Sequence, residues 1–315
     1  MSNWMTAIGL SAGLSLAALV PARQSRPAAG TEYPPELIEQ LELVRTVTAR
    51  FQDHRVALEE GFERFGGDSP LMGEHWYRRD RPNETFDIGK PSVLQYLPVG
   101  DERILVGVAY TVYRLPGEPL PEGFVGGEDL WHIHDLVKIA RAASLDRPLL
   151  RWVAERRIHN GKIGAGDGRT ELTMVHAWVW LDNPDGVFAQ DNRVLPYLRA
   201  GLPPEYAAEA SADAAFGVSL LSNQACDFEL RRLGFMAGVR WRQRRTLRAA
   251  CSEAAGKVRT VLATDPDAAT FNAAAAEAWR DYLQVRQQTL TPQQVERLGA
   301  GIEFPMGQHG HHPRG

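Results

Sequence analysis

The chain has little cysteine, no large excess of charge of either sign and, beyond its N-terminus, no long apolar run. Its two cysteines, Cys226 and Cys251, are too few for a structural zinc site made of cysteine alone, because such sites use four ligands. The formal net charge of −4 gives no reason to expect general affinity for nucleic acid or for an anionic membrane. Without a second long apolar run, no later membrane-spanning helix is expected. The composition, 44% hydrophobic and 23% charged, is that of an ordinary globular protein.

The first 22 residues have the features of a secretory signal peptide. The segment from Met1 to Ala22 contains no charged side chain, and its apolar run ends in small residues of the kind that a signal peptidase recognises. It also lacks the usual basic residue before the apolar run, and a retained N-terminal anchor is the alternative. We expect an exported protein, periplasmic or extracellular, in which residues 23–35 form a polar linker.

The middle of the chain has the two-residue period of β-strands, after a segment with helical period. Residues 36–65 carry apolar side chains at helical spacing. Residues 140–170 are rich in Arg and Gly and are expected to form an insertion with a short strand or helix and a loose loop. Strands are expected over residues 92–98, 103–114, 130–139 and 172–181. The pattern predicts an α+β domain over residues 36–200, with a small antiparallel sheet and a covering helix.

Residues 205–300 are rich in Ala, Arg and Leu and predict a C-terminal helical module, which is a candidate surface for a protein partner. Within it, the segment Asp265-Pro266-Asp267 is expected to cap one helix, and Thr291 and Gln294 to begin another by reciprocal capping. Residues 301–315, rich in His, Gly and Pro, are expected to be disordered.

The two cysteines lie in the helical module and allow two interpretations. Export favours a disulfide, which requires Cys226 and Cys251 to come within roughly 7 Å between Cα atoms, so that the chain must reverse between them. Gly234 and Gly238 are the candidate positions for that turn. A single helix through both glycines would instead leave two separate thiols.

Histidines in segments rich in aromatic residues are the candidate functional residues. Residues two apart on a strand face the same side, so His132 and His134 would present two imidazoles side by side. His176 has the same alternation on another predicted strand, and His75 lies in a third aromatic segment. Neutral imidazole is a good ligand for zinc, copper and iron. We therefore predict a transition-metal site, its metal being zinc, copper or iron, formed by His75, His132, His134 and His176.

Three functions are compatible with this pattern. The leading hypothesis is an exported protein that binds one transition metal for storage, sensing or catalysis. The second is an enzyme that uses a metal-bound water, with Glu74 and Asp135 as the carboxylates nearest in sequence. The third is a metal-free interaction protein that acts through its helical module, with the histidines as hydrogen-bonded core residues.

Several motifs occur in order along residues 70–192, and together they resemble a group of secreted bacterial proteins of uncharacterised activity. Members share MGxHW, LVGVxY, WHxH and HxWxxxxNPxGxFAxxN segments, which correspond here to segments beginning at Met72, Leu105, Trp131 and His176. The resemblance implies export and a metal site, without a reaction. This chain departs from the pattern at Ser92, where Glu is usual, and it lacks the Cys that follows the His-x-His segment. A ligand set that used that Cys would therefore differ here.

Overall fold

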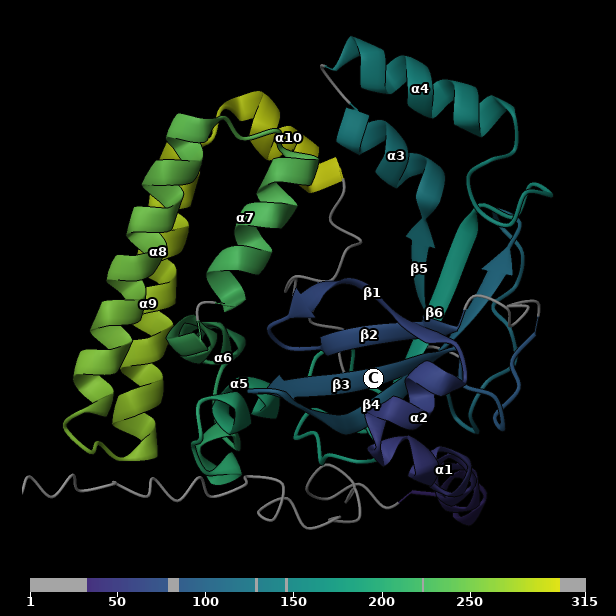
Figure 1. Ribbon diagram of the computed structural model, residues 1–315, viewed down its shortest axis with the longest axis horizontal. Coiled ribbons are helices and arrows are strands. Elements are labelled where there is room, and N and C mark those ends of the chain that lie inside the picture. Colours follow the sequence, from purple (N-terminus) through teal and green to yellow (C-terminus); the bar gives the residue numbers. More distant parts are fainter. Residues whose placement is uncertain (1–32, 79–84, 128–129, 145–146, 223, 301–315) are drawn as a thin grey trace, which may run out of the picture.

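The computed structural model describes residues 33–78, 85–127, 130–144, 147–222 and 224–300 (Figure 1). The predicted signal peptide, nearly all of the predicted linker and the His-rich tail lie outside these residues. Within the described ranges, no helix is both long enough and apolar enough to cross a bilayer.

A six-stranded sheet, antiparallel throughout, forms the centre of the N-terminal part, with the strand order β1-β2-β3-β4-β6-β5 (Figure 1). Its strands are β1 (Phe62–Ser69), β2 (Gly73–Arg78), β3 (Val93–Val99), β4 (Glu102–Arg114), β5 (His132–Asp135) and β6 (Glu171–Ala177). The sheet and the helices that follow it confirm the predicted α+β class.

The predicted helix over residues 36–65 is interrupted and shorter than expected. It consists of α1 (Pro35–Thr48), a 3-10 turn (Ala49–Gln52) and α2 (His54–Glu59), and the last residues of the predicted helix belong to β1. Asp53 has extended backbone angles and its side chain accepts a hydrogen bond from the Arg55 amide, so it ends one helical segment and caps the next. Gly61, at φ 82°, then turns the chain into β1, a strand that residue periodicity did not reveal.

The predicted strand over residues 130–139 is also wrong in length. Its strand part is only β5, and α3 (Leu136–Ser144) follows directly. The Asp135 carboxylate accepts a hydrogen bond from the Lys138 amide and so caps the start of this helix. The predicted insertion contains α4 (Pro148–His159), which lies at the periphery beyond α3 (Figure 1).

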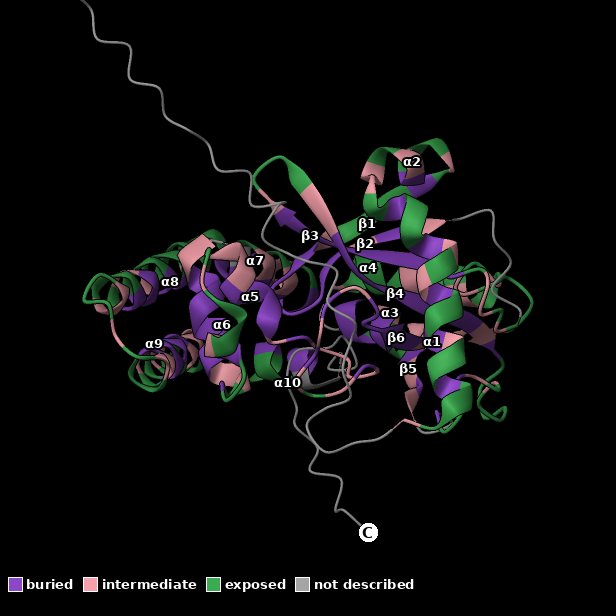
Figure 2. Cartoon of the chain, turned by 90° about the horizontal axis from the view of Figure 1, so that it is seen from below, coloured by how far each residue is buried: buried purple, intermediate pink, exposed green. Residues whose placement is uncertain are grey.

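The two faces of the sheet are covered by different parts of the chain. On one face, Leu94, Val108 and Ala177 share a core with apolar residues of α1 and of the turn that follows it. On the other face, Leu97 and Trp178 belong to a core that continues into the C-terminal helices. Figure 2 shows the buried residues concentrated in the strands and in α5 and α6, with exposed residues along the outer sides of the flanking helices.

The C-terminal part is helical, as predicted. Its elements are α5 (Val194–Arg199), α6 (Ala212–Ser219), α7 (Gln224–Met236), α8 (Trp241–Leu262), α9 (Ala268–Thr289) and α10 (Pro292–Ala300), with 3-10 turns at Pro204–Ala207 and Leu220–Ser222. Both predicted caps are confirmed. The Asp267 side chain accepts from the Thr270 amide, and Thr291 and Gln294 exchange side-chain to backbone hydrogen bonds.

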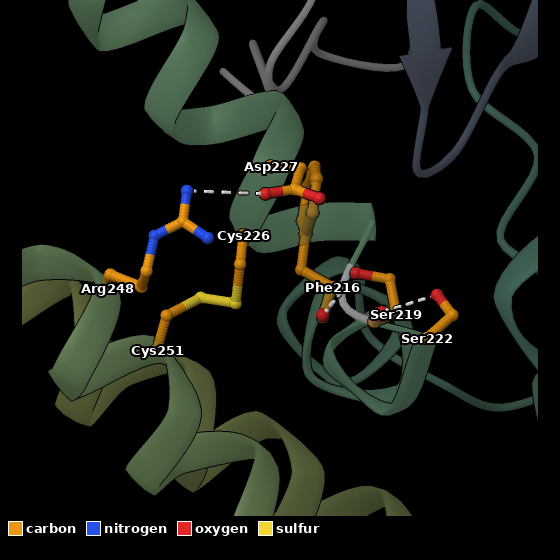
Figure 3. Close-up of a disulfide and its surroundings, with 7 residues drawn as sticks. All are labelled: Phe216, Ser219, Ser222, Cys226, Asp227, Arg248 and Cys251. Atoms are coloured by element: carbon orange, nitrogen blue, oxygen red, sulfur yellow. Dashed lines mark hydrogen bonds and ion pairs between the residues drawn. A yellow bond between two sulfur atoms is a disulfide. The ribbon is translucent and has the colours of Figure 1, made fainter. Parts of the chain in front are cut away.

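A disulfide between Cys226 and Cys251 joins α7 to α8, with the Cα atoms 5.9 Å apart (Figure 3). The chain reverses between the two helices, where Gly238 has φ 63°. The interpretation of one continuous helix with two thiols is therefore wrong, because the break after Met236 brings the two cysteines together. Beside the bridge, Arg248 and Asp227 form an exposed ion pair across the same two helices, 3.6 Å apart (Figure 3).

Candidate metal centre

The strand register places all four predicted histidines on one face of the sheet. His132 pairs with Met174 across β5 and β6, and His134 pairs with Leu172, so both imidazoles share the face of Met174. His176 lies two residues beyond Met174 on β6 and therefore has the same orientation.

His75 lies on the same face but on β2, which β3 and β4 separate from β6. Along β2, β3 and β4 it lies in one cross-strand row with Gln95 and Gly107. A Cβ atom on Gly107 would come within 2.9 Å of the Ala177 carbonyl oxygen and 3.2 Å of the Trp178 ring, so only glycine fits at this position. Gly107 therefore allows the Gln95 side chain and the Trp178 ring to pack closely over β4 on this face.

The four rings form a connected cluster. The ring centres of His132 and His134 are 4.9 Å apart, those of His132 and His176 are 5.3 Å apart, and those of His75 and His176 are 5.7 Å apart. The four rings therefore lie near one another on one face of the sheet, whereas the predicted convergence of their ring nitrogens stays a prediction.

These separations are close to those of imidazoles that share an ion. With metal–nitrogen bonds of about 2.0–2.1 Å and a ring centre about 1.1 Å behind the ligating nitrogen, two rings in a tetrahedral site have centres about 5.1 Å apart. In the described part of the chain, however, no group of three or more His, Cys, Asp or Glu side chains is arranged to hold a metal ion as the rings stand. The spacing suits a metal, and the ring orientations would have to adjust to bind one.

Backbone carbonyl groups orient two of the imidazoles. The Nδ1 atom of His176 lies 2.9 Å from the Gln190 carbonyl oxygen, which can only accept, so Nδ1 carries the hydrogen and Nε2 keeps a free lone pair. The ring of His75 hydrogen-bonds to the backbone of Gly73. Such contacts are typical of metal-binding histidines, where they fix the tautomer and the ring direction.

One ring nitrogen of the cluster, Nε2 of His132, is inaccessible to water and has no hydrogen-bond partner among the residues that the structure describes. A core histidine normally satisfies its buried polar atoms. An unsatisfied nitrogen among other imidazoles is therefore more typical of a ligand than of a structural residue.

The cluster holds its imidazoles uncharged. Burial, together with the neighbouring histidines, lowers the pKa of His75 to about 4 and that of His132 to about 3. Burial also places the pKa of His176 well below its ordinary value. Because metals bind the neutral ring, these side chains are ready to coordinate at neutral pH without first losing a proton.

The two carboxylates that the sequence placed nearest have other partners. Glu74 is buried with one oxygen 2.9 Å from Arg64 and the other 2.8 Å from Arg103, and it also accepts from the Trp76 indole. Its position next to His75 in β2 puts it on the opposite face of the sheet. Asp135 caps α3. Neither is placed to act as a general base at the cluster.

Sequence reasoning missed two groups of the site, Met174 and the Gln190 carbonyl. Met174 lies with its Sδ atom 3.2 Å from Nε2 of His176. Its position two residues before His176 was a usable signal, because residues two apart on a strand lie on the same face of the sheet. The Gln190 carbonyl comes from a loop that folds back after β6, and no local pattern indicates that contact.

Comparison of the chain with protein-family models, with curated proteins and with solved structures finds no match.

Proposed function

We propose that this protein is an exported protein that binds one transition-metal ion through His75, His132, His134 and His176. The observation that carries the proposal is the spacing of the four rings on one face of the sheet, 4.9 to 5.7 Å between successive centres. Two further contacts support it. The tautomer of His176 leaves a lone pair on its Nε2 atom, and the buried Nε2 atom of His132 has no hydrogen-bond partner among the residues that the structure describes.

Export is supported by the chemistry of the two cysteines. A disulfide such as Cys226–Cys251 persists in oxidising compartments and is rare in reducing ones. The uncharged apolar run at the N-terminus and the resemblance to secreted bacterial proteins favour the same location.

Metal binding is favoured over the two alternatives by specific contacts. A hydrolytic enzyme with a metal-bound water needs a base near that water, whereas Glu74 is held by two arginines and Asp135 caps a helix. A metal-free core would have to leave the buried Nε2 atom of His132 unsatisfied, which costs about 1–3 kcal/mol.

The test is metal content and affinity of protein purified without a polyhistidine tag. Equilibrium dialysis against Zn(II) and, separately, against ascorbate-reduced copper(I) under anaerobic conditions, each followed by elemental analysis, should give one ion per chain for at least one of the two metals. His132→Gln and His176→Gln should each lower the affinity at least tenfold, since each removes a ligand from the central pair of rings. His159→Gln, at an exposed position on α4, is the matched control and should bind as the native protein does. Native protein that takes up no metal, or variants that bind like the control, would refute the proposal.

A further inference from the structure

The contact between Sδ of Met174 and Nε2 of His176 is not a hydrogen bond, because neither atom carries a hydrogen to donate. The Gln190 carbonyl holds the hydrogen of His176 on Nδ1, so Nε2 carries a lone pair, and a thioether sulfur has no hydrogen to donate. Two acceptors therefore face each other at 3.2 Å. A cation between them would turn this unfavourable contact into a favourable one.

The separation of the two atoms suits a shared ion. With metal–nitrogen and metal–sulfur bonds of about 2.0 and 2.3 Å, two ligands at a tetrahedral angle lie about 3.5 Å apart. The Nε2 to Sδ distance is 3.2 Å, so a small displacement of the flexible methionine side chain would admit the ion.

His132 is the candidate third ligand beside these two. It is the direct cross-strand partner of Met174, and its ring centre lies 5.3 Å from that of His176. Its buried Nε2 atom has no hydrogen bond to any residue that the structure describes. His176 is buried while His132 and Met174 are partly exposed, so the three side chains lie between the core and the surface.

We propose that the ion bound by this cluster is copper(I), held by Nε2 of His132, Nε2 of His176 and Sδ of Met174. This inference rests on the proposed metal-binding function and names the metal. It also narrows the histidine ligands to His132 and His176 and adds Met174. Soft thioether sulfur favours copper(I) over the harder zinc(II). All three ligands are uncharged, and transferring an ion from water into a partly buried site costs more as its charge increases, which favours the monovalent ion. His75 and His134 flank the trio with further imidazoles.

Competition experiments on the native chain test the assignment. Copper(I), kept reduced by ascorbate under anaerobic conditions, is titrated against a chromophoric copper(I) chelator, and zinc(II) affinity is measured separately. Met174→Leu keeps the side-chain volume and removes the sulfur, and Met236→Leu, in the core of the helical part, is the matched control. We expect Met174→Leu to weaken copper(I) binding at least tenfold and to change zinc(II) binding less than twofold, with the control unchanged for both metals.

A second measurement does not depend on any variant. The copper K-edge X-ray absorption spectrum of the copper(I)-loaded native protein should contain one sulfur scatterer, and that sulfur should be absent from folded Met174→Leu. Histidine-dependent metal binding without a sulfur scatterer, or with equal copper(I) affinity in Met174→Leu, would overturn the copper(I) assignment and leave the proposed function standing. Failure to bind either metal would overturn both.

Discussion

The ring centres of His75 and His176 lie 5.7 Å apart although β3 and β4 separate their strands. In a flat sheet, three strand spacings would put the two backbones about 14 Å apart. The rings meet because the sheet curls, which brings β2 toward β6 on the face that both side chains share. The cluster is therefore a consequence of sheet curvature.

The neutral imidazoles make the metal-free protein sensitive to acid. The pKa of His75 is about 4 and that of His132 is about 3 in the folded chain, below the ordinary 6.5, so only the unfolded chain takes up protons as the pH falls below 6.5. The free energy of unfolding has its full value above pH 6.5 and declines toward pH 4. At pH 5 it is lower by roughly 2 kcal/mol for each of these two histidines.

Urea unfolding of chelator-treated protein at pH 7.5 and at pH 5 measures this loss. In His75→Gln the decline between the two pH values should be smaller by about 2 kcal/mol than in the native chain. The exposed-site variant His159→Gln should decline as the native chain does. Equal declines in all three proteins would contradict the assignment of His75 as a neutral residue.

The Cys226–Cys251 bridge should stabilise the helical part. Closing a loop of this length removes conformational freedom from the unfolded chain and contributes about 3 kcal/mol. Thiol titration of denatured, unreduced protein should detect no free thiol. The double variant Cys226→Ala/Cys251→Ala should unfold at a lower urea concentration than the oxidised native protein, and reduction should have no further effect on it. Two titratable thiols in the untreated protein would show that the bridge is absent.

Gly73, next to the cluster, should not tolerate a side chain. It has φ 72°, and a Cβ atom there would lie 2.4 Å from the Tyr96 carbonyl oxygen. Gly100 has φ 59°, and a Cβ atom added to it would meet no other atom within 4 Å, so a side chain there brings the same backbone strain without the steric contact. Gly100→Ala should cost about 1–2 kcal/mol of unfolding free energy.

Gly73→Ala should cost at least roughly 2 kcal/mol more than Gly100→Ala, because backbone must move to relieve the contact. It should also weaken metal binding, since the Gly73 backbone orients the His75 ring. Similar unfolding free energies for the two variants would mean that the Tyr96 contact is not restrictive.

Secretion should remove the first 22 residues. The uncharged apolar run and the small residue Ala22 at its end predict a mature chain that begins at Arg23. N-terminal sequencing of protein from the periplasm or the culture medium measures this directly. Ala22→Leu should slow processing, because signal peptidases require a small residue at that position. Recovery of a chain that begins at Met1 in the membrane fraction would favour a retained anchor instead.

The sequence by itself determined the elements whose patterns are local. The β3–β4 hairpin follows from a run of β-branched and aromatic residues, the starts of α9 and α10 from their caps, and the shared face of His132 and His134 from the two-residue period of a strand. Each of these patterns depends on neighbours within a few residues, so no tertiary information was needed.

Only the tertiary structure decided what depends on distant contacts. β1 contains polar residues and glycine, and it is a strand because β2 pairs with it. The meeting of His75 with His176, the position of Met174 opposite His132 and the carbonyl of Gln190 at the His176 ring depend on strand order, sheet curl and a returning loop. Local periodicity fixes the face on which a side chain lies, whereas the partners across that face are fixed by how the strands are ordered and how the sheet bends.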